Sequence, residues 1–310
     1  MFKTWRHAVL CAWISGMVMA AIHAAPPLSA APSSLPPPDT VASTGPDGLI
    51  VLPRAHSHND YTRKRPLFDA LREGFCSVEA DIHLVDGVLL VAHDADQCRP
   101  ENTLEAMYLN PLRERVNQNG GRVYPGYGGR FILLIDFKTG DDATMDALLN
   151  LLERYREMLT VFTDTETREG AVTVILSGGA PRERLFQNPE RLAAIDGNPG
   201  ELDIDLNAHR VPLVSAGWSS VFTWTGKGDM PENERARLRD LVHKAHERGG
   251  MIRFWGLPRP WVLWPVLREA GVDLLNADNL NALRDLLMDR DSRPRRDNQG
   301  KEMPPCTHRA

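Results

Sequence analysis

The feature of this sequence that most constrains its fold is a regular alternation of apolar, β-branched runs with helix-like stretches across residues 49–288. The strand-like runs are Leu49–Leu52, Cys76–Leu84, Val88–Ala92, Phe131–Phe137, Val172–Leu176, Leu202–Leu206 with Val211–Val214, Met251–Phe254 and Val272–Leu275. The helix-like stretches are Leu67–Glu73, Asp142–Met158, Glu232–Arg248, Pro260–Ala270 and Leu280–Met288. Such alternation predicts βα units and a parallel sheet.

The number of strands points to one architecture within this α/β class. About eight strands in about 240 residues is the size of a single (β/α)8 TIM-type barrel. A doubly wound open sheet is the alternative, but no glycine-rich G-x-G-x-x-G turn follows the first strand-like run. The sequence therefore predicts one barrel domain over residues 49–288.

Both ends of the 310-residue chain differ from this body in composition. Residues 1–24 combine a basic start, an apolar run of about 15 residues and small residues before Pro26, which predicts a cleaved signal peptide and a secreted or periplasmic location. An uncleaved membrane anchor is the alternative, although a membrane span needs roughly 20 apolar residues. Residues 25–48, rich in Pro, Ala and Ser, are expected to form a disordered linker, and residues 289–310 a disordered charged tail.

The charge of the body excludes one class of partner. The chain has 36 basic and 41 acidic residues, of which residues 1–47 hold two of each and residues 289–310 hold six and four. Residues 48–288 therefore carry 28 basic and 35 acidic residues, a net charge of −7. Nucleic-acid-binding domains are usually strongly basic, so we expect no nucleic-acid partner. Four cysteines are too few for a disulfide scaffold, and we expect a monomer.

The first strand-like run leads into His56-Ser57-His58-Asn59-Asp60. Histidines two positions apart in an extended chain point the same way, and imidazole titrates near neutral pH. His56 and His58 are therefore candidates for acid–base catalysis or metal binding. The alternative is a turn closed by Asn59 and Asp60, with both histidines on the surface.

Alternation along the second run places Glu79, Asp81 and His83 on one face of an otherwise apolar strand. Two carboxylates on such a face repel each other unless a cation lies between them, and oxygen ligands suit Mg²⁺ or Ca²⁺. The alternative is an edge strand with one solvated face.

A third carboxylate, Asp136, lies near the end of the run Phe131–Phe137, with Lys138 on the same face. Asp136 would complete a metal site with Glu79 and Asp81, and Lys138 would hold an anionic group as a compact charge. A simple ion pair between Asp136 and Lys138 is the alternative. Because chemistry in TIM barrels gathers at the C-terminal ends of the strands, we expect these side chains to meet there.

These motifs resemble the glycerophosphodiester phosphodiesterase and phosphatidylinositol-specific phospholipase C (PI-PLC) superfamily. The resemblance rests on His56 and Asn59, on Glu79-Ala80-Asp81, and on Asp86-Gly87 followed by His93-Asp94. The stretch His-Ser-His-Asn-Asp-Tyr at residues 56–61 is similar to the branch represented by altered inheritance of mitochondria protein 6.

The resemblance implies a PI-PLC-like phosphodiesterase barrel and a role for each matching residue. Members share two catalytic histidines, a divalent cation held by carboxylates and groups that contact the phosphate. The matching residues here are His56 and His93 as catalytic histidines, Glu79, Asp81 and Asp136 as metal ligands, and Lys138, Asn59, His58, Arg253 and Trp255 as substrate-binding residues. This chain departs from the common His-Arg-Gly at the first strand, so the phosphate-contacting arginine is missing at that position.

We therefore expect a secreted, metal-dependent phosphodiesterase that cleaves a glycerophosphodiester or a phospholipid head group. His56 would take the proton of the attacking hydroxyl and His93 would protonate the leaving alkoxide, each transfer being worth about 10²–10⁴-fold in rate. The Mg²⁺ or Ca²⁺ would neutralise charge that develops on the phosphoryl group. With a lipid substrate, peripheral membrane contact through Trp218, Trp224, Trp261 and Trp264 is one expectation, and ordinary barrel–helix packing of these residues is the other.

Two other functions stay open at the level of sequence. The His56-x-His58 pair is also typical of amidohydrolase and PHP-type barrels, which bind zinc, but those barrels need further histidines after their middle strands and none occurs there. The other function is a barrel that binds phosphate esters or glycans at the cell envelope without turnover.

Overall fold

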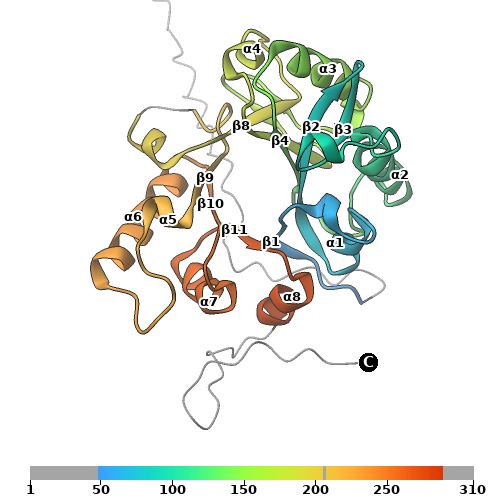
Figure 1. Cartoon of the computed structure of the whole chain (residues 1–310). Helices are drawn as coiled ribbons and strands as arrows, with labels where there is room; N and C mark the ends of the chain where they lie inside the picture. Colours follow the sequence, from blue (N-terminus) through green and yellow to red (C-terminus); the bar gives the residue numbers. More distant parts are fainter. Residues whose placement is uncertain (1–47, 205–206, 289–310) are drawn as a thin grey trace, which may run out of the picture. The chain divides into compact units, whose positions relative to one another are not determined.

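The computed structural model of the chain describes residues 48–204 and 207–288, and eight parallel strands in it close into a barrel (Figure 1). The barrel strands are β1 (Leu52–Ser57), β2 (Phe75–Val85), β4 (Phe131–Phe137), β7 (Val172–Gly178), β8 (Ala193–Gly197), β9 (Leu213–Gly217), β10 (Met251–Trp255) and β11 (Leu274–Ala277). Strand β1 pairs with both β2 and β11, which closes the ring. The predicted (β/α)8 TIM-type barrel is thus confirmed.

Three further strands lie outside the ring. Strand β3 (Val88–Val91) returns antiparallel along β2 as a hairpin, and β5 (Val161–Phe162) pairs with β6 (Thr167–Arg168) in a separate antiparallel ribbon. The tip of the first hairpin is Asp86-Gly87, where both residues have positive φ. Glycine adopts this conformation without steric cost, which suits a tight reversal.

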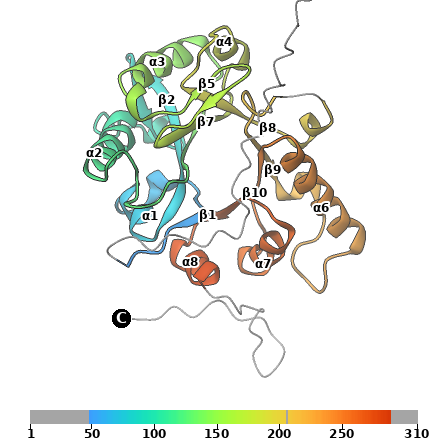
Figure 2. The same cartoon turned by 180° about the vertical axis from the view of Figure 1, so that it is seen from behind.

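Helices surround the barrel on the outside, as Figures 1 and 2 show from opposite sides. They are α1 (Phe68–Arg72), α2 (Asn110–Gln118), α3 (Asp142–Glu153), α4 (Arg182–Phe186), α5 (Trp218–Val221), α6 (Glu232–Glu247), α7 (Pro260–Ala270) and α8 (Leu280–Met288). Short helical turns are η1 (Asp60–Thr62), η2 (Ala95–Gln97), η3 (Glu105–Leu109), η4 (Arg156–Met158) and η5 (Pro199–Asp203). No described helix has both the length and the apolar character needed to cross a membrane.

The main core lies between the barrel and these helices. Residues that alternate with the interior positions of each strand face outward, so Val78, Ala80 and Ile82 of β2 are fully buried under the helices. Burying a valine or isoleucine side chain stabilises a fold by about 1.5–3 kcal/mol. Period-two alternation therefore divides each strand between an outer core and the barrel interior.

Several predicted elements need correction. The run Val88–Ala92 was expected in the barrel but forms the hairpin strand β3, which lies outside the ring. The strand expected at Leu202–Leu206 is wrong where it is described, because Pro199–Asp203 is the helical turn η5, capped by Asn198. The barrel strand missed by the sequence pattern is β8, since Ala193–Gly197 is too short and too poor in β-branched residues to stand out.

The predicted terminal segments fall on residues that the structure does not describe. The signal peptide at residues 1–24, nearly all of the linker at 25–48 and the tail at 289–310 lie outside the described residues. The barrel expected over residues 49–288 lies within them, apart from residues 205–206.

Candidate active site

The interior of the barrel is divided into an apolar part and a polar part. Six side chains form the apolar part: Ile132, Leu134, Ile175, Leu213, Met251 and Leu274. Residues two positions farther along these strands point the same way, and there the side chains become polar: Asp136, Ser177, Ser215, Arg253 and Asn276. The polar groups therefore gather toward the C-terminal ends of the strands, where TIM barrels carry their chemistry.

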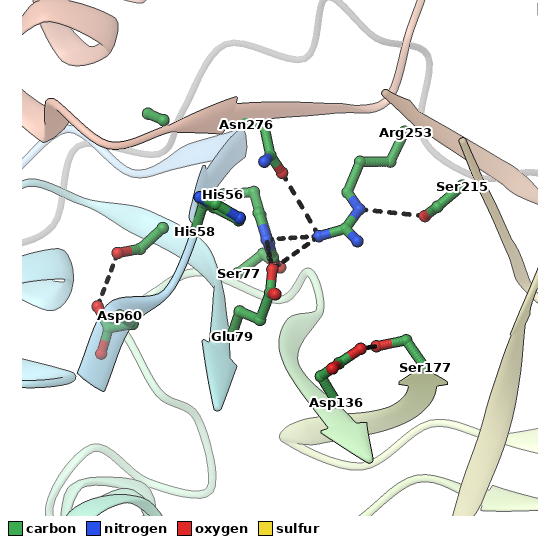
Figure 3. Close-up of polar contacts among 12 residues, drawn as sticks. His56, His58, Asp60, Ser77, Glu79, Asp136, Ser177, Ser215, Arg253 and Asn276 are labelled. Atoms are coloured by element: carbon green, nitrogen blue, oxygen red, sulfur yellow. Dashed lines mark hydrogen bonds and ion pairs between the residues drawn. The ribbon is translucent and has the colours of Figure 1, made fainter. Parts of the chain in front are cut away.

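His56 lies at the centre of this polar layer (Figure 3) and is fully buried. Its Nδ1 is 2.7 Å from Ser77 Oγ, and its Nε2 is 2.8 Å from Arg253 Nη1 and 3.0 Å from Glu79 Oε2. The Nε2 atom therefore lies against both a donor, the Arg253 N–H, and an acceptor, the Glu79 carboxylate. Burial, and then the Arg253 charge, lower the pKa of His56 to about 4. The imidazole is therefore neutral at neutral pH.

The buried guanidinium of Arg253, a residue of β10, contacts side chains from five other strands, β1, β2, β8, β9 and β11. Its Nη1 lies 3.0 Å from Glu79 Oε2, its Nε donates to Ser215 Oγ at 3.1 Å, and its Nη2 lies 3.8 Å from Asp196 Oδ2. Burial alone would raise the pKa of Glu79, but the Arg253 charge and the His56 hydrogen bond lower it well below its usual range. Burial raises the pKa of Asp196 to about 7 despite the same arginine.

A second charged cluster surrounds Lys138. The Lys138 Nζ lies 2.7 Å from Asp81 Oδ2 and 2.9 Å from Asp136 Oδ2. Asp81 and Asp136 are neighbours because they are paired in register between β2 and β4. The Tyr61 hydroxyl donates to Asp81 Oδ2 at 2.7 Å, and the Ser177 hydroxyl donates to Asp136 Oδ1 at 2.7 Å. The predicted Asp136–Lys138 ion pair is present and also includes Asp81.

The three predicted metal carboxylates are divided between these two clusters. Among residues 48–204 and 207–288, no three His, Cys, Asp or Glu side chains form a group that could hold a metal ion. However, Asp81 Oδ1 is buried with no hydrogen-bond partner in the described structure, and a buried oxygen in that state needs a partner. Asp81 and Asp136 thus fit a divalent cation, whereas Glu79 would join them only by turning away from Arg253. Metal binding by all three stays a prediction.

His58 and Asn59 occupy the turn that leaves β1. The His58 Nδ1 lies 2.8 Å from Asp278 Oδ1 at the end of β11. Asn59 has φ 46° and ψ 48°, a left-handed conformation in which asparagine is enriched. Its carbonyl accepts hydrogen bonds from the amide and hydroxyl of Thr62. Asn59 therefore shapes this turn, and its predicted contact with substrate stays a prediction.

His93 and Trp255 lie at the surface. The His93 side chain is 54% exposed, and its Nδ1 lies 3.2 Å from Asp94 Oδ1. Trp255 is 47% exposed and follows Arg253 by two residues, so both lie on the same face of β10. A Cβ atom on Gly217 would lie 3.1 Å from the Trp255 ring, so this glycine leaves room for the ring at the barrel mouth.

Sequence reasoning missed several polar residues of the site. Each of them contacts a predicted site residue: Ser77, Asp196, Ser215, Asn276, Ser177 and Tyr61. The signal for Ser177, Ser215 and Asn276 was available, since each polar residue follows an apolar interior residue by two positions. Asp196 lies on the strand β8 that was itself missed.

The His56-x-His58 zinc site of the amidohydrolase alternative is not formed by the described residues. The His56 Nε2 contacts Arg253 and Glu79, and the His58 Nδ1 contacts Asp278, so the two histidines have different partners. No group of three metal-binding side chains includes them in the described part of the chain.

Comparison with known proteins identifies the family of this chain. Residues 49–194 match the family of AIM6-like phosphodiesterase domains. This range includes β1, β2 and β4. Altered inheritance of mitochondria protein 6 of Eremothecium gossypii is 32% identical over 269 residues, covering 75% of this chain and 69% of that protein. The Kluyveromyces lactis protein of that name is 27% identical, covering 75% and 71%, and the Arthroderma benhamiae homolog is 27% identical, covering 76% and 84%. This chain therefore belongs to the AIM6-like phosphodiesterase family.

Proposed function

We propose that this barrel cleaves a glycerophosphodiester or a phospholipid head group by metal-assisted acid–base catalysis. The observation that carries the proposal is a neutral imidazole, His56, held beside the buried guanidinium of Arg253. A neutral imidazole can accept a proton, and a guanidinium binds phosphate oxygens. The phosphodiesterase family of the chain supports the same class of reaction.

In the proposed reaction His56 is the base. Its Nε2 accepts the proton of the attacking hydroxyl as the oxygen bonds to phosphorus, and Ser77 and Glu79 hold the ring in position. Arg253, and Lys138 at the edge of the mouth, attract the anionic diester and hold its oxygens. A base placed in this way contributes about 10²–10⁴-fold to the rate.

A divalent cation, Mg²⁺ or Ca²⁺, belongs to the proposal. Asp81 and Asp136 would hold it, with Glu79 as a third ligand. When bound, such a cation supplies Lewis-acid stabilisation of the negative charge on a phosphoryl oxygen. The unpartnered Asp81 Oδ1 supports this assignment.

The proposed reaction also needs an acid for the leaving alkoxide. Two histidines compete for this role: His93, which the resemblance implies, and His58 at the end of β1. Without an acid, the leaving oxygen would depart as an anion. An alkoxide is too basic to leave readily in this form, whereas the anion of a more acidic alcohol can do so.

We also propose export and a peripheral contact with lipid. The proposed export rests on the sequence of residues 1–24. Of the four tryptophans expected at a lipid-binding rim, Trp218, Trp224 and Trp264 are buried, whereas Trp261 is 44% exposed. The exposed Trp255 is the last residue of β10 and Trp261 lies in the first turn of the following helix α7, and tryptophan favours the membrane interface. Sedimentation with phosphatidylcholine vesicles would test this contact.

The experiment that tests the function is an activity screen of the purified chain. The substrates are bis(p-nitrophenyl) phosphate, glycerophosphodiesters and lysophospholipids, each with Mg²⁺, with Ca²⁺ and with a chelator. We expect metal-dependent cleavage that falls by about 10²–10⁴-fold in the His56→Gln variant. His243→Gln, an exposed histidine on α6, is the matched control and should keep full activity.

Two results would contradict the proposal. Inactivity on every ester and metal would instead support a barrel that binds phosphate esters or glycans without turnover. Full activity in the His56→Gln variant would remove His56 from the reaction.

A further inference from the structure

His58 and Asp278 form a built pair at the mouth of the barrel. Ser57 of β1 is in register with Ala277 of β11, so the next residue of each strand emerges beside the other. The His58 Nδ1 lies 2.8 Å from Asp278 Oδ1, and since an ionised carboxylate only accepts, Nδ1 carries the proton. The other ring nitrogen, Nε2, makes no hydrogen bond to any residue in 48–204 or 207–288. That nitrogen is available to a substrate.

Arg63 fixes both members of this pair. Its Nη2 donates to the carbonyl oxygen of His58 at 2.9 Å and to that of Ala277 at 3.4 Å, and its Nη1 donates to the carbonyl oxygen of Asp278. The His58 amide also donates to the Ala277 carbonyl at 3.2 Å. One guanidinium therefore holds the backbone of both strand ends, and the carboxylate holds the ring. A histidine oriented by a third group is typical of catalytic arrangements.

His58 lies close to the base of the proposed reaction. It follows His56 by two residues, directly after the end of β1, and Figure 3 shows the His58 ring beside the His56 ring, which contacts Glu79 and Arg253. Its charge contributes to lowering the pKa of His56. Burial opposes protonation of His58, but the hydrogen bond that it donates to Asp278 and the negative charges of Glu79 and Asp278 together outweigh burial and raise the pKa of His58 above 6.5.

His93 has no comparable support. Its side chain is 54% exposed, and its ion pair is with the adjacent residue Asp94, which is itself exposed. Within residues 48–204 and 207–288, no hydrogen bond or ion pair joins the His93 ring to His56, Glu79 or Arg253.

We propose that His58, oriented by Asp278, is the acid that protonates the leaving alkoxide. This inference rests on the proposed function, because it names the second proton transfer of the same reaction. As the bond between phosphorus and the leaving oxygen breaks, its electron pair goes to that oxygen, which takes the proton from His58 Nε2. His58 becomes neutral and keeps its Nδ1–H on Asp278, while His56 holds the proton taken from the attacking hydroxyl. Exchange with water restores both rings.

The test compares two leaving groups in one series of variants. A p-nitrophenolate ion is a weak base and leaves without a proton, whereas an alkoxide such as the glycerol oxygen needs one. The purified full chain with added Mg²⁺ is assayed on bis(p-nitrophenyl) phosphate and on glycerophosphocholine. We expect His58→Gln to lose about 10²–10⁴-fold on the alkyl ester and less than about tenfold on the aryl ester. Asp278→Asn, which changes a positioning residue, should shift the ratio of the two rates in the same direction by a smaller factor.

Each outcome is decisive. A misfolded variant would lose both activities, and its lowered melting temperature would reveal this. If His58→Gln does not fold, Asp278→Asn gives a second measurement of the ratio of the two rates. Equal losses on both esters in well-folded His58→Gln protein would overturn the inference. A selective loss on the alkyl ester in His93→Gln instead of His58→Gln would assign the acid to His93. Inactivity of the unmodified chain on both esters would refute the proposed function itself, and this inference with it.

Discussion

Replacing Arg253 by methionine tests the electrostatics at the centre of the barrel. The Arg253 side chain is 5% exposed and its Nη1 lies 3.0 Å from the Glu79 carboxylate, which is 9% exposed. At an effective dielectric constant of about 20, two unit charges at this separation attract by about 5–6 kcal/mol. Removing one partner of a buried pair costs about 3–5 kcal/mol, because the other charge is left without compensation. For a barrel of this size, that loss corresponds to a fall in melting temperature of about 6–20 °C.

The second substitution identifies the cause of that loss. Glu79→Gln removes the charge that the methionine would leave uncompensated, while it keeps nearly the same shape. We therefore expect the double variant R253M/E79Q to be more stable than R253M alone. The free energy of unfolding is measured by urea denaturation in the presence of a chelator, so that no metal can replace the arginine. A loss below about 1 kcal/mol for R253M, which is the effect of an average substitution, would refute the reasoning. So would a double variant no more stable than R253M.

Three further predictions concern metal, pH and backbone. Mg²⁺ or Ca²⁺ at a hundredfold excess over its dissociation constant should stabilise the chain by about 2.7 kcal/mol. In a calorimetric scan, Asp136→Asn should abolish most of this gain. If the metal does not raise the melting temperature of the unmodified chain, the proposed cation site is wrong. The hydrogen bond to Asp273 raises the pKa of His246 from 6.5, so its contribution to stability is complete below that pH and is lost as the pH rises through the folded-state value. The melting temperature of His246→Gln should therefore be lower than that of the unmodified chain, and the difference should be largest at acid pH. A difference that grows as the pH rises would contradict this. Gly74→Ala should destabilise the chain far more than Gly87→Ala, although both glycines have positive φ. A Cβ on Gly74 would lie 2.0 Å from the Ile50 carbonyl oxygen, whereas a Cβ on Gly87 would have nothing within 4 Å. Similar denaturation midpoints for the two variants would disprove the clash.

Strand alternation predicted which residues face the barrel interior better than it predicted what they contact. Glu79 and Asp81 are two positions apart on β2 and share a face, as expected, yet they belong to different clusters. The partner of Glu79 is Arg253, 174 residues later in the chain. A period-two pattern contains the direction of a side chain but no information about which distant strand lies opposite. That assignment comes from the order and register of the closed sheet.

The limits of the strand predictions have the same physical origin. Strongly apolar runs such as Phe131–Phe137 mark strands that are buried on both faces, and the sequence predicts these strands. Strand β8 is buried on both faces as well, but Ala193 and Ala194 are small and Asp196 is polar. Small residues fill a crowded barrel position, but they do not form the run of large apolar residues by which a strand is recognised in a sequence. Asp196, the buried acid beside Arg253, was lost together with its strand.

The charges of the site supply an argument for the proposed cation that neither cluster supplies alone. Glu79, Asp81 and Asp136 are offset by Arg253 and Lys138. The His58–Asp278 pair adds no net charge when the histidine is protonated. With these three carboxylates ionised and Asp196 protonated, which its raised pKa favours below about pH 7, the interior has an excess of one negative charge, and an anionic diester would raise this to two. Two like charges in a partly buried space repel strongly. A divalent cation bound at Asp81 and Asp136 would return the loaded site to neutrality, so metal and substrate should each strengthen the binding of the other.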